Sequence, residues 1–184
     1  GGLERDRYDY TKSPTYILAT DRDGAVVGSL RLLPTIGETM LRNEFSEFFS
    51  QPLDVTSPTI WECTRFCVHS THDGAARGSA QSISSELLMG LCQFAMSTGI
   101  EQIVGLYEAH MARVYRRIGW SPQPLVHARA EVGPLILGVW TVSRDALDAM
   151  KGRCKSDANM FERPNKVRRL PMEVPANHRL LVQK

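Results

Sequence analysis

The chain of 184 residues is about one domain long, and its hydrophobic fraction of 42% is enough for a substantial core. No apolar run approaches the roughly 20 residues of a membrane span and no charged-then-apolar leader precedes a cleavage site, so we expect a soluble, cytoplasmic globular protein. The net charge of +2 hides an asymmetry, because residues 1–150 hold 13 Lys and Arg against 17 Asp and Glu, whereas residues 151–184 hold 9 against 3.

The N-terminal half of the chain predicts a β-hairpin, a helix and a buried strand. Residues 15–33 (TYILATDRDGAVVGSLRLL) contain two apolar runs around Arg-Asp-Gly at 22–24, and Asp-Gly in such a place is a strong hairpin signal. Residues 38–49 (ETMLRNEFSEFF) carry apolar side chains at helical spacing, which predicts an amphipathic helix. Residues 59–69 (TIWECTRFCVH) follow turn signals and read as a strand.

The C-terminal half predicts a long helix and two more strands. Residues 78–98 have an apolar stripe at helical spacing, with Ser79 or Ser82 as the N-cap and Gly99 after the last turn. The segments that follow are a strand over 100–107, a short helix over 108–120 that ends at Gly119, and a strand over 134–143. This order predicts a mixed α/β plan on one sheet. The long helix has the length of a crossover, which would make strands 59–69 and 100–107 parallel.

The basic part of the chain is its C-terminal end, so we predict a domain over 1–150 and a basic appendage over 151–184. The appendage contains three prolines after residue 160 and little periodicity. It is either a solubilising tail or a docking surface for an acidic partner. A nucleic-acid-binding module has only this tail in its support, because the domain lacks a basic stripe interleaved with aromatic residues, so we expect no nucleic-acid partner.

The four cysteines are too few and too irregularly spaced for a disulfide framework, and we expect reduced thiols. One cluster has the ligand types of a zinc site, namely Cys63, Cys67, His69 and His72. Zinc motifs usually separate two ligand pairs by a dozen residues or more, and a strand cannot fold back on itself within ten residues. We therefore expect no metal site.

Charged residues inside or beside the apolar strands are the main candidates for chemistry. They are Asp6 and Asp9 in ERDRYD, Arg31 in SLRLLP, and Glu62 and Arg65 in WECTRF. Burial of a lone charge costs several kcal/mol, so these acids and arginines are expected to meet in one network. The alternatives are a structural ion-pair cluster, unrelated surface charges, or an Arg31 that reaches water from an edge strand. A regular strand would place Glu62 and Arg65 on opposite faces.

These three motifs, in this order and at this spacing, resemble the acyl-homoserine-lactone synthases, the quorum-sensing autoinducer synthases of bacteria. The resemblance runs from about residue 3 to about residue 143 and includes YRRIGW. It implies an α/β, GNAT-like three-layer fold with a mixed, splayed central sheet. It also implies an acyltransferase that moves an acyl group from acyl carrier protein or acyl-CoA to the amine of S-adenosylmethionine. Lactonisation then releases methylthioadenosine, and no cofactor is expected, because both reactants are substrates.

The resemblance also implies roles for the charged residues. Asp6 and Asp9 would belong to the S-adenosylmethionine side, together with Arg31. Arg31, Glu62 and Arg65 would form the charged cluster at the reaction centre, with Glu62 as the general base that deprotonates the substrate amine. GNAT-like sheets interrupt the central strand with a bulge, and a bulge between Glu62 and Arg65 would turn both side chains toward one cleft.

Two further groups of residues follow from the resemblance. Gly105, Phe66 and Met111 are expected to line the acyl pocket. Family members that make 3-oxo products often have Thr at the position of Gly105, so we expect an unsubstituted, branched or 3-hydroxy acyl group, unless the glycine only lets backbones pack closely. The carrier-docking candidates are Arg113, Arg116 and Arg117, which share one face of a helix and otherwise form a solvated face.

Two departures from the family pattern keep an alternative open. The family uses an Arg, a Phe and a Trp in an N-terminal segment that this chain lacks, and the chain begins with Gly-Gly, so we expect it to be trimmed or to begin within a longer protein. The alternative is a generic GNAT N-acetyltransferase that uses acetyl-CoA. Its phosphate-binding loop Q/R-x-x-G-x-G/A is matched by Gly78 and Ala80 in the small-residue segment 72–81, but Ala75 stands where Gln or Arg is expected.

Overall fold

The structure is a computed structural model that describes residues 5–10, 14–20, 24–69 and 76–154. Six strands form one sheet, and they are β1 (Thr15–Thr20), β2 (Val26–Pro34), β3 (Ile60–Val68), β4 (Gln102–Glu108), β5 (Gln123–His127) and β6 (Leu135–Thr141). Their spatial order is β1-β2-β3-β4-β6-β5. Every neighbouring pair is antiparallel except β3 and β4, which are parallel. The mixed sheet and its crossover were predicted correctly.

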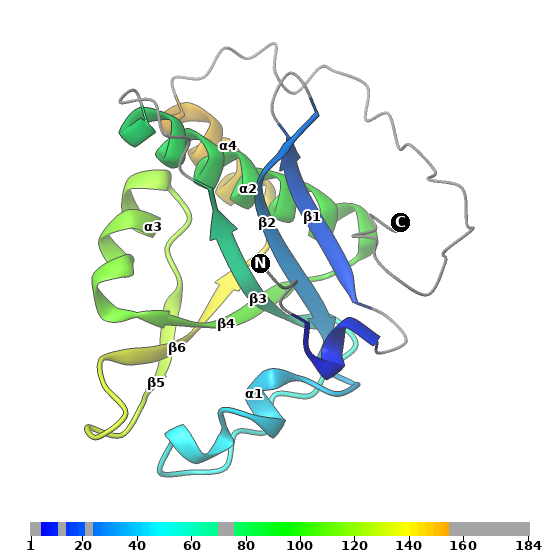
Figure 1. Ribbon diagram of the computed structural model, residues 1–184, viewed down its shortest axis with the longest axis vertical. Coiled ribbons are helices and arrows are strands. Elements are labelled where there is room, and N and C mark those ends of the chain that lie inside the picture. The colour runs from blue at the N-terminus through cyan, green and yellow to red at the C-terminus, as the bar shows by residue number, and fades with distance from the viewer. Residues whose placement is uncertain (1–4, 11–13, 21–23, 70–75, 155–184) are drawn as a thin grey trace.

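The helices lie on both faces of the sheet (Figure 1). The α-helices are α1 (Met40–Asn43), α2 (Ala76–Thr98), α3 (Ala112–Ile118) and α4 (Arg144–Arg153), and the 3-10 helices are η1 (Arg7–Tyr10), η2 (Ser46–Phe48) and η3 (Ala109–Met111). One core cluster joins α2 and α4 to inward side chains of the sheet such as Leu30 and Leu32. A second cluster joins Leu41 of α1 to Val104 and Leu137 on the opposite face. The result is a three-layer arrangement.

The hairpin, β3, β4, β6 and the long helix α2 confirm the sequence predictions, but the helix over 38–49 was wrong. Only one α-helical turn forms, followed after a break by η2. Thr39 caps α1 by accepting a hydrogen bond from the N–H of Arg42, and Glu44 already ends it. The aromatic residues of this segment pack against the second core cluster, with the rings of Phe45 and Phe48 5.3 Å apart. Tertiary contacts therefore overrode the helical period.

Other boundaries also differ from the predictions. The segment 72–81 was expected to be a loop, yet α2 begins at Ala76, so Ser79 and Ser82 lie inside the helix and do not cap it. The short helix predicted over 108–120 is divided into η3 and α3. It ends at Gly119 as expected, and the φ of this glycine is 105°. Three elements were missed: η1, β5 and α4. Helix α4 runs to Arg153, three residues beyond the boundary drawn at 150, and residues 155–184 lie outside the described part.

Strand β3 contains a bulge at Arg65. Arg31 of β2 pairs with Thr64 and Ser29 pairs with Cys67, so β3 has one residue more than β2 in this interval. The φ of Arg65 is 51°, the left-handed region that side chains other than glycine rarely adopt. Before the bulge Trp61 and Cys63 pack toward the α2 side, and after it Phe66 and Val68 do so. The bulge therefore resets the alternation, and it lies at Arg65 rather than between Glu62 and Arg65.

The parallel strands β3 and β4 separate soon after they begin. Their ladder consists of Ile60–Gln102, Trp61–Ile103 and Glu62–Val104, although both strands continue well beyond Glu62 and Val104. Beyond this point side chains from both strands line a cavity instead of a ladder. The splayed sheet that was expected is present.

Candidate active site

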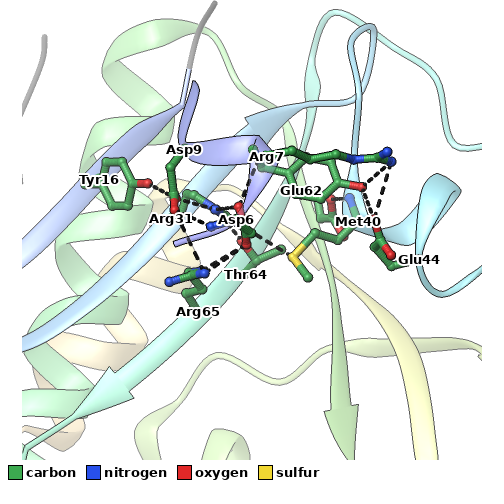
Figure 2. Close-up of polar contacts among 11 residues, drawn as sticks. Asp6, Arg7, Asp9, Tyr16, Arg31, Met40, Glu44, Glu62, Thr64 and Arg65 are labelled. Carbon is green, nitrogen blue, oxygen red and sulfur yellow. Dashed lines mark hydrogen bonds and ion pairs between the residues drawn. The ribbon is translucent and has the colours of Figure 1, made fainter. Parts of the chain in front are cut away.

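Arg31 of β2 is the centre of an ion cluster with Asp6 and Asp9 from the N-terminal segment (Figure 2). Its side chain is 0% exposed and β2 lies between β1 and β3, so the alternative of an arginine that reaches water from an edge strand does not hold. Nη1 lies 2.7 Å from Oδ1 of Asp6 and 2.6 Å from Oδ1 of Asp9. Nε donates to the hydroxyl of Thr64 at 3.1 Å. Two acids and one strand residue therefore hold this guanidinium on three sides.

Arg65 joins the same cluster through the bulge. Its Nη2 donates to Oδ2 of Asp6 at 2.9 Å, so Asp6 bridges the two arginines. Burial alone would raise the pKa of Asp6, but hydrogen bonds and charge from Arg31 and Arg65 lower it to about 2. The pKa of Asp9 is also lowered despite burial, because Tyr16, a backbone N–H and Arg31 donate to it. Both carboxylates are thus ionised at neutral pH.

Local hydrogen bonds explain why Arg7–Tyr10 forms η1 next to the cluster. The carboxylate of Asp6 accepts from the N–H of Tyr8 at 2.9 Å, and the carboxylate of Asp9 accepts from the N–H of Asp6 at 2.9 Å. Tyr8 is 1% exposed, and its hydroxyl donates to Glu44 at 3.0 Å. The turn is therefore fastened to the sheet by its acids and to the end of α1 by its tyrosine.

Glu62 is buried but stands apart from the ion pairs, so four of the five predicted charges form the network and Glu62 does not. Its side chain is on the same face as Thr64, the residue 2% exposed, and its oxygens accept from the N–H groups of Met40 and Leu41, both at 2.8 Å. Burial raises the pKa of Glu62 to about 7, and the two N–H groups and the charge of Arg31 only partly oppose this rise. A carboxyl with such a pKa can exchange a proton at neutral pH.

Two cavities meet at the bulge. The larger has a volume of about 360 Å³ and lies between the splayed strands on the side of α2 and α3, and the smaller, of about 200 Å³, lies on the side of α1. They share Cys63, Thr64, Arg65 and Leu106 as lining residues. Glu62 lines the smaller cavity. Arg65 therefore lies where a ligand in the larger cavity would meet a ligand in the smaller one.

The acyl-pocket candidates all line the larger cavity, namely Gly105, Phe66 and Met111. A Cβ on Gly105 would lie 3.1 Å from the carbonyl oxygen of Cys63, so the glycine keeps β4 close to β3 at the point where the strands begin to separate. The larger cavity is lined mainly by apolar and aromatic side chains, which suits a hydrocarbon chain.

The docking candidates Arg113, Arg116 and Arg117 are exposed on α3. The same helix contributes Tyr115 to the larger cavity, so the basic patch lies on the outer side of a cavity wall. Ala75 and the side chains of residues 76–80 lie outside the described part of the chain, so the phosphate-loop prediction stays a prediction.

Sequence reasoning missed several lining or bonding residues. Thr64 and Tyr16 hold the ion cluster, and Tyr107, Tyr115 and Trp140 form an aromatic wall of the larger cavity. Tyr107 could have been predicted as a lining residue, since it follows Gly105 by two residues on one strand and therefore lies on the same face of the sheet. Within the described ranges no three His, Cys, Asp or Glu side chains are placed to hold a metal ion, and no helix there is long and apolar enough to cross a membrane. His72 lies outside those ranges.

The sequence of this chain matches known proteins of one family. The family model described as autoinducer synthase matches residues 1–146. An acyl-homoserine-lactone synthase from Rhizobium etli is 54% identical over 142 residues, which are 77% of this chain and 66% of the relative. One from Agrobacterium fabrum strain C58 is 31% identical over 162 residues, which are 88% of this chain and 70% of the relative. The chain thus spans about two thirds of the length of these curated relatives.

Solved structures give the same result for the fold. The CoA-dependent acyl-homoserine lactone synthase BjaI, with S-adenosylmethionine and isopentyl-CoA, has a TM-score of 0.68 at 26% identity, covering 82% of this chain and 68% of that one. LasI has a TM-score of 0.70 at 26% identity, covering 82% and 75%. A structure described as an N-acetyltransferase from Lactobacillus plantarum, at 16% identity and a TM-score of 0.50, shares the fold alone. The fold is therefore GNAT-like, as expected.

Proposed function

Because this chain belongs to the autoinducer synthase family, we propose that it acts as an acyl-homoserine-lactone synthase. It transfers an acyl group from a thioester donor to the α-amine of S-adenosylmethionine. The new amide then lactonises, because the substrate carboxylate attacks the carbon next to the sulfonium and displaces methylthioadenosine. The product is a quorum-sensing signal. Both reactants are substrates, so the enzyme needs no resident cofactor.

The observation that carries this proposal is the meeting of two cavities at Arg65, with Glu62 lining one of them. A two-substrate transfer needs two pockets that bring their reacting atoms together. The apolar cavity on the α2 side takes the acyl chain, with Gly105, Phe66 and Met111 in its wall. The cavity on the α1 side takes the amine end of S-adenosylmethionine, next to the ion cluster of Asp6, Asp9 and Arg31.

Glu62 is the general base of the proposed reaction. The amine of S-adenosylmethionine is protonated at neutral pH and must lose a proton before its lone pair can attack the thioester carbonyl. Glu62 accepts that proton, directly or through one water, and its pKa of about 7 suits both acceptance and release. The thiol leaves with the second amine proton when the tetrahedral intermediate collapses, so the proton count balances.

The surrounding groups orient the substrates and stabilise charge. Arg65, which lines both cavities, binds the substrate carboxylate, and the fully buried Arg31 fixes Asp6 and Asp9, of which Asp6 in turn orients Arg65. Beyond Glu62 the ladder between β3 and β4 ends, so backbone N–H groups of β3 are suited to stabilise the oxyanion of the intermediate. Both substrates are products of cytoplasmic metabolism, and we place the enzyme there.

The acyl donor is coenzyme A or acyl carrier protein. The CoA-dependent neighbour BjaI supports the former, and the exposed arginines of α3 support the latter, because acyl carrier protein is acidic. The basic segment 151–184 is a second candidate dock.

The test is to incubate the full-length protein with S-adenosylmethionine and either octanoyl thioesters of both carriers or acetyl-CoA, and to follow methylthioadenosine, acyl-homoserine lactone and the acyl donor by mass spectrometry. We expect both products in equal amounts. A generic acetyltransferase would instead consume acetyl-CoA and release no methylthioadenosine, and that result would refute the proposal.

A further inference from the structure

The backbone partners of Glu62 come from a helix that is too short to be stable alone. Helix α1 has four residues, whereas an isolated helix needs on the order of a dozen residues in water. The N–H of Met40 donates to Oε2 of Glu62 and that of Leu41 donates to Oε1, both at 2.8 Å. Contacts from outside α1 must therefore hold these two N–H groups on the carboxylate.

The guanidinium of Arg42 connects α1 to the segments before and after it. Nη1 donates to the carbonyl oxygen of Gly37 and Nη2 to that of Thr35, both at 3.0 Å. Nη2 also donates to the hydroxyl of Thr56 at 2.7 Å. The first two acceptors lie in the turn that follows β2, and Thr56 lies in the segment that leads into β3. One side chain thus joins α1 to both neighbouring segments.

These segments are in turn fixed to the strand that carries Glu62. Thr35 is 1% exposed, and its N–H donates to the carbonyl oxygen of Ile60 at 3.2 Å. The Thr35 hydroxyl lies 2.7 Å from the same carbonyl oxygen and accepts from the N–H of Ser57 at 3.0 Å. Ile60 is the first residue of β3, the strand that also contains Glu62. Arg42 therefore ties α1 to a hydrogen-bonded frame that includes the strand of Glu62.

Arg42 is exposed, and substitutions of exposed side chains usually change the free energy of unfolding little. Its three hydrogen bonds instead fix where α1 lies, and with it the direction of the N–H groups of Met40 and Leu41. We propose, on the basis of the function proposed above, that Arg42 is a positioning residue that holds these N–H groups on Glu62 and so favours the ionised form of this general base. Among the described residues Arg42 is not part of the lining of either cavity, so it acts on the reaction through α1.

Glu62 has charged and titratable neighbours on β2, β3 and α1 and at η1. They are Arg31, Arg42, Cys63 and Arg65, together with Asp6 and Asp9, which pair with Arg31 and Arg65. The charges of Arg31 and Arg42 and the N–H groups of α1 lower the pKa of Glu62, although burial keeps it at about 7. The Cys63 thiol is neutral, because burial raises its pKa to about 12. Loss of Arg42 would remove one positive charge and loosen two donors, and both changes raise the pKa of Glu62.

The first measurement is the pH dependence of kcat/KM for wild type, Arg42→Gln and Arg42→Lys, with S-adenosylmethionine and an octanoyl thioester. Because a base with a higher pKa is still protonated at neutral pH, the rising limb of both variants should move up by about half a pH unit or more. At pH 7 kcat/KM should then fall about twofold or more, whereas above about pH 9 it should approach the wild-type value. Lysine keeps the charge but lacks the planar fork that reaches three oxygens, so it separates the position of α1 from charge alone. Arg129→Gln, which removes an exposed arginine paired with Glu131, is the control and should keep the wild-type profile.

The second measurement needs no turnover. Hydrogen exchange of the Met40 and Leu41 amides, followed by NMR, should be about tenfold faster in both Arg42 variants than in wild type, and the Glu62 carboxyl carbon should titrate at higher pH. Thr56→Val removes one acceptor of the guanidinium and is the milder variant, so it should shift both observables in the same direction by a smaller amount. Circular dichroism melts show whether each variant is folded.

The outcomes separate this inference from the proposed function. An unchanged rising limb in folded Arg42→Gln, or unchanged exchange of the two amides, would overturn the inference. A wild-type profile for Arg42→Lys would assign the effect to charge alone and would overturn it as well. If the Arg42 variants do not fold, the shift of Thr56→Val decides in their place. Failure of the wild type to form any acyl-homoserine lactone would refute the proposed function, and the amide exchange and the Glu62 titration would still decide whether Arg42 positions the two N–H groups.

Discussion

Replacing Asp6 by Asn tests whether the ion cluster holds η1 on the sheet through charge. The side chain of Asn keeps an oxygen that can accept from the N–H of Tyr8, so the turn itself is preserved and only the charge is removed. The variant leaves Arg31 and Arg65 with one carboxylate fewer. We expect a folded protein that is less stable at neutral pH.

The size of the effect follows from the pKa of Asp6. A fall from 3.8 to about 2 corresponds to about 2 kcal/mol, at 1.36 kcal/mol for each pKa unit, and the side chain is only 24% exposed, so screening by solvent is limited. The folded-state pKa lies below the unfolded one. The stabilisation is therefore complete above about pH 4 and is lost as the pH falls toward 2.

The assay is urea denaturation between pH 7 and pH 3. At pH 7 the free energy of unfolding of Asp6→Asn should be lower by about 2 kcal/mol or more, because a buried arginine also loses a partner. Between pH 5 and pH 3 the variant should lose less stability than the wild type. Asp148→Asn, on the exposed face of α4, is the matched control. A variant within about 0.5 kcal/mol of wild type at pH 7, with the same acid sensitivity, would refute the reasoning.

Three further predictions concern the reaction. The kcat/KM of the wild type should rise as the pH increases through about 7, where Glu62 loses its proton, and Glu62→Gln should lower turnover about 10²- to 10⁴-fold. Gly105→Thr should shift the preference among paired acyl donors toward 3-oxo chains, measured as a ratio of kcat/KM, although its Cβ will lie tightly against the carbonyl of Cys63. Reversal of Arg116 and Arg117 to Glu should raise KM for a carrier-linked donor more than for acyl-CoA.

Each of these has a result that would count against it. A folded Glu62→Gln enzyme within a few-fold of wild type would remove Glu62 from the proton transfer. No gain in 3-oxo preference for Gly105→Thr would make the glycine a packing residue only. An unchanged KM after the charge reversal, equal to that of the control Arg129→Glu outside α3, would move the carrier dock elsewhere.

Local patterns predicted those elements whose sequence signals match their final environment. The hairpin follows from Asp-Gly between apolar runs, and α2 follows from its apolar stripe with a left-handed Gly99 after it. Strand β5 was missed because it contains Pro124 and mostly exposed side chains at the edge of the sheet. Helix α4 was missed because only Leu147 and Met150 are buried in ten residues.

The sequence predicted which charged residues belong to the site but not which groups each of them contacts. Arg31, Asp6 and Asp9 meet as expected, because a buried guanidinium needs carboxylates. The partners of Glu62 are backbone N–H groups of α1, 21 and 22 residues away in the sequence, and no side-chain pattern encodes such a contact. A prediction from charged residues alone therefore placed Glu62 in the ion cluster of Arg31, Asp6 and Asp9, to which it does not belong.

The bulge explains why one strand serves both halves of the site. Glu62 and Thr64 face η1 and α1 by ordinary alternation, and the left-handed Arg65 turns toward the same acids instead of toward α2. The next residue, Phe66, is thereby returned to the acyl side of the sheet. Without the extra residue Arg65 would project into the apolar cavity, and Phe66 would project into the ion cluster. A single inserted residue in β3 thus separates a charged pocket from an apolar one while keeping them in contact.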